Sequence, residues 1–215
     1  MASKVMLLSG KLVLASGSPR RSQIMTSAGF DFMTRVSDVD ESAIGEGLHA
    51  TDLAVALAEA KARAVASEMP DATVIGADTV VSKNRVLYAK PEDAEDARRM
   101  LRELAGRSHT VITGVAIVAN GQVVSGHQST LVNMRDYDAD EIAAYVESGS
   151  PLDKAGAYGI QGRASLFTKR IEGCFYNVVG FPVAPFWLAL ERITEGQATD
   201  YCSDHAAPDL LALNR

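Results

Sequence analysis

Cysteine is scarce in this chain of 215 residues. Only Cys174 and Cys202 are present, and neither a CxxC pair nor a histidine cluster accompanies them. This scarcity argues against a disulfide framework and against a structural zinc site.

Long hydrophobic runs are also lacking. The apolar run at 5–8 is too short for the hydrophobic region of a signal peptide, and no stretch approaches the length of a membrane-spanning helix. We therefore expect a cytoplasmic protein that has no membrane partner.

An excess of positive charge is missing as well. Lysine and arginine total 21 against 27 acidic residues, which gives a net charge of -6. An acidic chain is a poor general binder of nucleic-acid polymers, because attraction to phosphate supplies most non-specific affinity. Any phosphate recognition must then rest on a few focused cations, which favours a small-molecule ligand.

The remaining composition is that of an ordinary globular protein, with 47% hydrophobic and 22% charged residues. The length suits one substantial core shared by at most two lobes, and the sequence contains no internal repeat or low-complexity linker. We expect an N-terminal extension over 1–11, one domain over 12–194, and a polar C-terminal tail over 195–215.

Strand and helix patterns alternate along the chain. A short buried strand at 12–15 precedes a helix with Ser18 at its N-cap, Pro19 at its first position and Gly29 as its stop. Further strands are expected at 73–77, 86–88, 111–118 and 122–124, and further helices within 51–69, 91–106, 138–149 and 181–193. These patterns predict an α/β or α+β fold with a mixed sheet.

Two features of these elements can be checked directly. The helix at 51–69 is expected to bury a stripe bordered by Lys61, and Asp138 with Glu141 predicts a capping box. The expected stripe consists of Leu53, Leu57, Ala60 and Ala64.

The segment 16–21 (SGSPRR) places Arg20 and Arg21 in the first turn of a helix. Cations at this end oppose the helix dipole by about 0.3–1 kcal/mol each. An anion that binds the free backbone N–H groups would offset both, and arginine suits bidentate binding of phosphate. The alternative is a surface helix whose two arginines are solvated.

Carboxylates and lysines in unusual settings form the remaining candidates. Asp78 follows an apolar strand, and Glu41 lies in an acidic loop; such carboxylates can hold Mg²⁺ against phosphates. Lys61 borders an apolar stripe and Lys90 precedes a helix-starting proline. In the glycine-rich segment 152–162, Gln161 offers both a donor and an acceptor to a base edge. Solvated acidic and basic side chains are the competing interpretation.

Together and in this order, these segments resemble the Maf family of nucleotide pyrophosphatases. The resemblance spans about 12–182, with matching blocks at 14–21, 75–81, 90–91, 113–115, 153–162 and 178–182. It implies an α/β fold like that of inosine-triphosphate pyrophosphatases, with a mixed central sheet, flanking helices and a cleft between two lobes. It also implies a homodimer and hydrolysis of a nucleotide to its monophosphate and pyrophosphate.

The resemblance also implies roles for individual residues. Asp78 matches the catalytic carboxylate, and Glu41, Lys61 and Lys90 match other catalytic positions, with Asp78 and Glu41 holding a divalent cation such as Mg²⁺, Mn²⁺ or Co²⁺. The implied substrate-binding residues are Ser16, Ser18, Arg20, Arg21, Thr79, Asp153, Lys154 and Gln161.

The block at 153–162 resembles the branch of the family that acts on dTTP and UTP, not the branch that acts on 7-methyl-GTP. Two alternatives stay open at this point. The chain could be a nucleotide-binding regulator of cell division without essential turnover, or a pyrophosphatase that removes purine nucleotides such as ITP.

Overall fold

The computed structural model describes residues 11–45 and 47–194, and its strands form one mixed sheet. The strand order is β2-β1-β3-β5-β6-β7, with β4 paired to β3; β1 runs parallel to β2 and β3, and the remaining pairs are antiparallel. The strands are β1 (Leu12–Ala15), β2 (Met33–Thr34), β3 (Thr73–Lys83), β4 (Val86–Tyr88), β5 (Ser108–Ala119), β6 (Gln122–Met134) and β7 (Thr168–Glu172).

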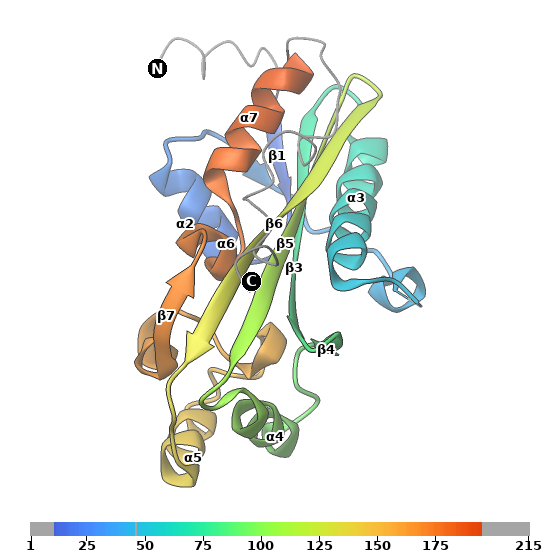
Figure 1. Ribbon diagram of the computed structural model, residues 1–215. Coiled ribbons are helices and arrows are strands. Elements are labelled where there is room, and N and C mark those ends of the chain that lie inside the picture. The colour runs from blue at the N-terminus through green and yellow to red at the C-terminus, as the bar shows by residue number, and fades with distance from the viewer. Residues whose placement is uncertain (1–10, 46, 195–215) are drawn as a thin grey trace, which may run out of the picture.

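Helices cover both faces of this sheet (Figure 1). The α-helices are α2 (Pro19–Ser27), α3 (Ala50–Glu68), α4 (Ala94–Leu104), α5 (Ala139–Glu147), α6 (Phe175–Val179) and α7 (Val183–Thr194). Short 3-10 helices occur at η1 (Glu41–Ile44), η2 (Ala155–Ala157) and η3 (Gly162–Phe167).

Side chains alternate between the two faces of β5, and this alternation divides the hydrophobic core into separate clusters. Ala116 and Val118 face α3, while Val115 and Ile117 face the cluster that contains Phe181. Further along that second face, the cores of α4 and α5 form another cluster, so the molecule has two lobes that share the long β5–β6 hairpin (Figure 1). This confirms the predicted α/β architecture with its mixed sheet.

Helix α3 lies unusually close to the sheet. A Cβ atom added to Gly76 on β3 would lie 2.1 Å from the carbonyl oxygen of Ala58, and one added to Gly114 on β5 would lie 2.2 Å from that of Ala54. Backbone therefore meets backbone at this crossing, which only glycine permits.

The predicted stripe of α3 is wrong in its phase. The residues that α3 buries are Ala54, Leu57, Ala58, Lys61, Ala62 and Val65, so only Leu57 of the expected stripe is buried. The helix turns its small alanines toward Gly76 and Gly114, because these allow the closest approach. Lys61 consequently lies inside the contact and not at its border.

Several other expectations need correction. Asp78 is not at a strand end, because β3 pairs with β5 from Val74 to Ser82 and continues to Lys83. Glu41 begins the short helix η1 and does not lie in a loop. The last helix starts at Val183, so Pro185 falls in its first turn, where the missing N–H costs nothing.

Two of the predicted helix starts are confirmed, and two predicted segments lie mostly outside the described residues. The capping box of Asp138 and Glu141 is confirmed, as is the position of Ser18 at the N-cap of α2, although its side chain makes no capping hydrogen bond. Strands β2 and β7 and helix α6 were not expected. The tail at 195–215 and most of the extension at 1–11 lie outside the described residues. Within the described ranges, no helix is long and apolar enough to cross a membrane.

Candidate active site

A cavity of about 740 Å³ opens between the two lobes. Its lining includes every site residue expected from the sequence: Ser16, Ser18, Arg20, Arg21, Glu41, Lys61, Asp78, Thr79, Lys90, Asp153, Lys154 and Gln161. We call Glu41, Lys61 and Asp78 the α3 wall, and residues 87–90 with 153–161 the loop wall. These residues come from six separate segments of the chain, which thus meet at one place.

The α3 wall is an ammonium group held between two carboxylates. Lys61 Nζ lies 2.6 Å from Asp78 Oδ1 and 2.8 Å from Glu41 Oε1. The side chains of Lys61 and Asp78 are only 11% and 14% exposed, whereas that of Glu41 is 52% exposed. A pair this sheltered from water interacts more strongly than a surface pair and would leave a buried charge if one partner were removed.

Local structure explains this geometry. Asp78 and Gly76 point to the same face of β3, and Gly114 is the cross-strand partner of Asp78 on β5. Because both glycines let α3 approach, the turn that carries Lys61 reaches the carboxylate of Asp78. Glu41 then closes the pair from the outside.

Arg21 lies beneath the segment 16–21 and donates several hydrogen bonds there. Its guanidinium donates to the carbonyl oxygens of Gly180 at 2.9 Å and Ala77 at 2.7 Å, and to the hydroxyls of Ser16 at 3.1 Å and Thr79 at 3.2 Å. Burial lowers the pKa of Arg21, and the charge of Asp78 opposes that effect. With four donors committed to protein oxygens, Arg21 fixes the shape of the cavity floor.

A chain of buried polar groups continues from Arg21. The hydroxyls of Thr79 and Thr113 lie 2.9 Å apart, and Asn177 Oδ1 accepts from the backbone N–H of Thr113 at 3.1 Å. The Asn177 amide also donates to the Val111 carbonyl and to Thr130 Oγ1. Thr113, Thr130 and Asn177 are fully buried and hydrogen-bonded, so this chain rigidifies the join between β3, β5 and α6.

Arg20 takes a different course from Arg21 and reaches the loop wall. Its guanidinium lies 3.3 Å from Asp153 Oδ2, while Lys154 Nζ contacts the other oxygen of that carboxylate. Burial raises the pKa of Asp153, but the hydrogen bonds from Lys154 and Arg20 outweigh this and hold it below its ordinary value. Arg20 therefore ties the two lobes together across the mouth of the cavity.

Lys90 and Gln161 are exposed at the rim of the cavity. Apolar side chains lie between these polar groups, among them Val36, Leu53 and Leu87. Such a mixture of apolar surface and a few placed polar groups is typical of a small-molecule site.

Charge distinguishes the cavity from the rest of the molecule. Its lining contains five cations (Arg20, Arg21, Lys61, Lys90 and Lys154) and three carboxylates (Glu41, Asp78 and Asp153), a balance of 5 − 3 = +2 in a chain whose net charge is -6. A cationic hollow in an acidic protein concentrates polyanionic small molecules at one point.

The carboxylates fit a metal that arrives with its ligand. Within residues 11–45 and 47–194, no group of three or more histidine, cysteine, aspartate or glutamate side chains could hold a metal ion alone. Asp78 and Glu41 nevertheless converge on one cationic atom, Lys61 Nζ. Two hard oxygen donors suit a cation such as Mg²⁺, which takes its other ligands from phosphates and water.

Comparison with known proteins decides the family. The model for "Maf-like protein" matches residues 11–193. This chain belongs to the Maf family. A "dTTP/UTP pyrophosphatase" of Pelotomaculum thermopropionicum is 47% identical over 176 residues, covering 81% of this chain and 92% of the relative. Another protein of that name, from Bacillus cereus (strain AH820), is 44% identical over 174 residues, covering 81% and 91%.

A solved structure of a HAM1 protein from Coxiella burnetii is also similar, at 17% identity and a TM-score of 0.42, covering 73% of this chain and 91% of that one. A match this weak adds nothing to the architecture that the strands and helices define directly.

Sequence patterns missed several residues that shape this Maf-family site. Asn177 and Thr113 are buried polar residues inside apolar segments. The only sequence signal for the hydrogen-bond network that they form was the asparagine itself, directly before Val178. Tyr88 and Tyr158 also line the loop wall. A tyrosine that ends the apolar run 86–88 predicts only core, and Tyr158 has no separate signal within the glycine-rich segment 152–162.

Proposed function

We propose that this protein is a nucleoside-triphosphate pyrophosphatase that hydrolyses dTTP and UTP to the monophosphate and pyrophosphate. The observation that carries the proposal is the cationic cavity, in which Asp78 and Glu41 share one ammonium group. The relatives named dTTP/UTP pyrophosphatase, at 44% and 47% identity over most of the chain, support the same activity.

Water attacks the α-phosphorus, the bond from that phosphorus to the bridging oxygen breaks, and pyrophosphate leaves with the electron pair. Asp78 accepts the proton of the water, and the ion pair with Lys61 holds its carboxylate in position in the cavity. Asp78 and Glu41 would hold a divalent cation that binds with the triphosphate, and this cation would supply charge neutralisation and Lewis acidity.

The remaining charges position the triphosphate. Lys90, Arg20 and Lys154 offer cations from the rim, and the N-terminus of α2 offers backbone N–H groups near Ser16 and Ser18. Arg21 acts through the floor of the cavity, since most of its donors bind protein oxygens. Gln161 and Thr79 face the space in which we place the pyrimidine.

The test is pyrophosphate release from dTTP, UTP and ITP, each with Mg²⁺, Mn²⁺, Co²⁺ or a chelator. We expect release from the pyrimidine nucleotides with a metal and none with the chelator. Asp78→Asn should lower kcat/KM by on the order of 10²–10³. Asp71→Asn, at an exposed position outside the cavity lining, is the matched control.

Each contrary result has a defined meaning. Near-wild-type turnover by Asp78→Asn would remove Asp78 from the reaction. A preference for ITP would overturn the pyrimidine assignment, and nucleotide binding without any release would favour a regulator of cell division. The metal that gives the fastest release identifies the cation.

A further inference from the structure

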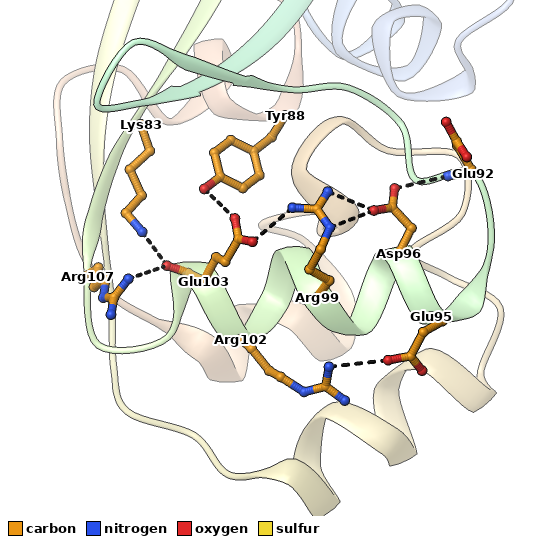
Figure 2. Close-up of polar contacts among 9 residues, drawn as sticks. All are labelled: Lys83, Tyr88, Glu92, Glu95, Asp96, Arg99, Arg102, Glu103 and Arg107. Atoms are coloured by element: carbon orange, nitrogen blue, oxygen red, sulfur yellow. Dashed lines mark hydrogen bonds and ion pairs between the residues drawn. The ribbon is translucent and has the colours of Figure 1, made fainter.

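A network on α4 lies behind the loop wall and outside the cavity. We call Asp96, Arg99 and Glu103 the α4 brace. Arg99 donates from Nε and Nη2 to Asp96 Oδ1 at 2.9 and 2.7 Å, and from Nη1 to Glu103 Oε1 at 2.9 Å. Figure 2 shows one guanidinium lying between the two carboxylates.

The second oxygen of each carboxylate points to the segment that carries Lys90. Glu103 Oε2 accepts from the hydroxyl of Tyr88 at 2.7 Å, and Asp96 Oδ2 accepts from the backbone N–H of Glu92 at 3.2 Å (Figure 2). Tyr88 and Glu92 stand on either side of Lys90, two residues away in each direction. The brace therefore holds the segment 88–92 at both ends.

Other contacts hold this segment as well. Tyr88 pairs with Val81 in the sheet, and the carbonyl oxygen of Ala89 accepts from the N–H of Gly156 at 3.0 Å. Beyond Lys90, the backbone N–H of Glu92 donates to Asp96, and Asp93, the N-cap of α4, accepts from the backbone N–H of Asp96 at 2.8 Å. The brace thus adds to the N-cap of α4 on the far side of Lys90 and connects that side to Tyr88.

We propose that Arg99, which lies outside the lining of the cavity, is a positioning residue that fixes Lys90 over the triphosphate by holding both carboxylates of the brace. This inference rests on the pyrophosphatase activity proposed above. Arg99 then affects turnover by fixing the position of Lys90 and not by contacting the substrate.

Electrostatics keep the brace assembled at neutral pH. The hydrogen bond from Arg99 lowers the pKa of Asp96, and the hydrogen bond from Tyr88 lowers that of Glu103, so both carboxylates stay ionised. The side chain of Arg99 is 52% exposed, so each ion pair alone contributes little. Its planar fork binds two carboxylates at once, which a lysine ammonium cannot reproduce in the same geometry.

The experiment measures pyrophosphate release from UTP by the full-length protein. Arg99→Met should lower kcat/KM by about three- to tenfold, the range that ion pairs of this exposure permit when two act together. Arg99→Lys should restore less than half of the loss, because a lysine ammonium cannot occupy the separate positions from which the guanidinium nitrogens of Arg99 reach Asp96 and Glu103.

Arg102→Met is the matched control, because Arg102 is on the same helix and, among the described residues, forms an ion pair with Glu95 alone, at 3.3 Å and away from the segment 88–92 (Figure 2). It should change kcat/KM by less than about twofold. The melting temperatures of both variants show whether either loss reflects unfolding.

A double-mutant cycle with Lys90→Met tests whether Arg99 acts through Lys90. We expect Arg99→Met to cost almost nothing further once Lys90 is gone, since coupled residues are not additive. An equal fold-loss in both backgrounds, or an equal loss in Arg102→Met, would overturn the inference while leaving the activity in place. If the wild type releases no pyrophosphate, the proposed function fails instead, which is a separate outcome.

Discussion

The two sides of the cavity are built on different principles. The α3 wall joins Lys61 to Asp78 through a sheltered ion pair, in a helix that lies directly on strand backbone at Gly76. The loop wall presents Lys90 and Asp153 from exposed segments, held by solvent-facing hydrogen bonds and by packing beneath them. The α3 wall depends on close backbone contact, and the loop wall depends on hydrogen bonds at the ends of its segments.

This difference separates the two kinds of chemistry that the proposed reaction needs. Proton transfer tolerates little error in distance, so a rigid wall suits Asp78. A triphosphate must enter and pyrophosphate must leave, so a wall held by individually weak contacts suits Lys90 and Lys154. Changes to the α3 wall should therefore cost stability and activity together, whereas changes to the loop wall should cost mainly activity.

The largest effect should come from breaking the α3 contact itself. Gly76→Ala would place a methyl group against the carbonyl oxygen of Ala58, and we expect a loss of about 3 kcal/mol in the free energy of unfolding. Urea denaturation measures this loss, and pyrophosphate release should fall with it because Lys61 moves away from Asp78.

Gly45→Ala is the control for that substitution. The added methyl group would meet only the Cδ1 atom of Leu53, the end of a flexible side chain, at 3.1 Å. If both alanine variants were equally stable, backbone contact would not be what sets the α3 wall.

The next effect concerns the packing beneath the loop wall. His109 is buried, its Nε2 lies 2.6 Å from the hydroxyl of Tyr158, and its Nδ1 has no hydrogen-bond partner in the described chain. Burial lowers the pKa of His109 to about 4, so the folded state favours the neutral ring. This contribution is present above pH 6.5 and is lost as the pH falls toward 4.

We expect the free energy of unfolding to drop by about 2–3 kcal/mol across that window on account of His109. His109→Gln should flatten this part of the pH profile, while His49→Gln, at the exposed start of α3, should leave it unchanged. Thermal melts at several pH values measure both. Identical profiles for wild type and His109→Gln would show that other groups cause the acid loss.

The smallest effect should come from removing one tie of the loop wall. Tyr88→Phe deletes the hydrogen bond to Glu103 and keeps the ring in its core, so about 1 kcal/mol of stability is at stake. We expect a loss of kcat/KM for UTP below about threefold, smaller than for Arg99→Met, because Asp96 still holds Glu92. A larger loss than that of Arg99→Met would place the ring itself in substrate binding.

Much of the α/β fold could be predicted from local patterns. The capping box at Asp138 and the strand before Ser16 are encoded within a few residues, and the structure contains both. The phase of α3 could not be predicted in this way. Hydrophobicity favoured Leu53, but the contact depends on alanines that meet glycines from another part of the chain.

The candidate site shows the same limit. The residue types and their order indicated which side chains gather, and the cavity lining contains them. The hydrogen-bond partners of these side chains could not be predicted, because the hydrogen bonds of Arg21 to Ala77 and Gly180 join positions far apart in sequence. Asp78 was expected at a strand end, since the long pairing of β3 with β5 has no local signal.

The crossing of α3 over Gly76 and Gly114 has one more consequence, which concerns temperature. Side chains change rotamer as a protein warms, but hydrogen-bonded helix and strand backbones keep their dimensions until the fold is lost. The gap between the backbone positions of Lys61 and Asp78 is set by two such backbones. Its length should therefore stay nearly constant on warming, up to the temperature at which the whole domain melts.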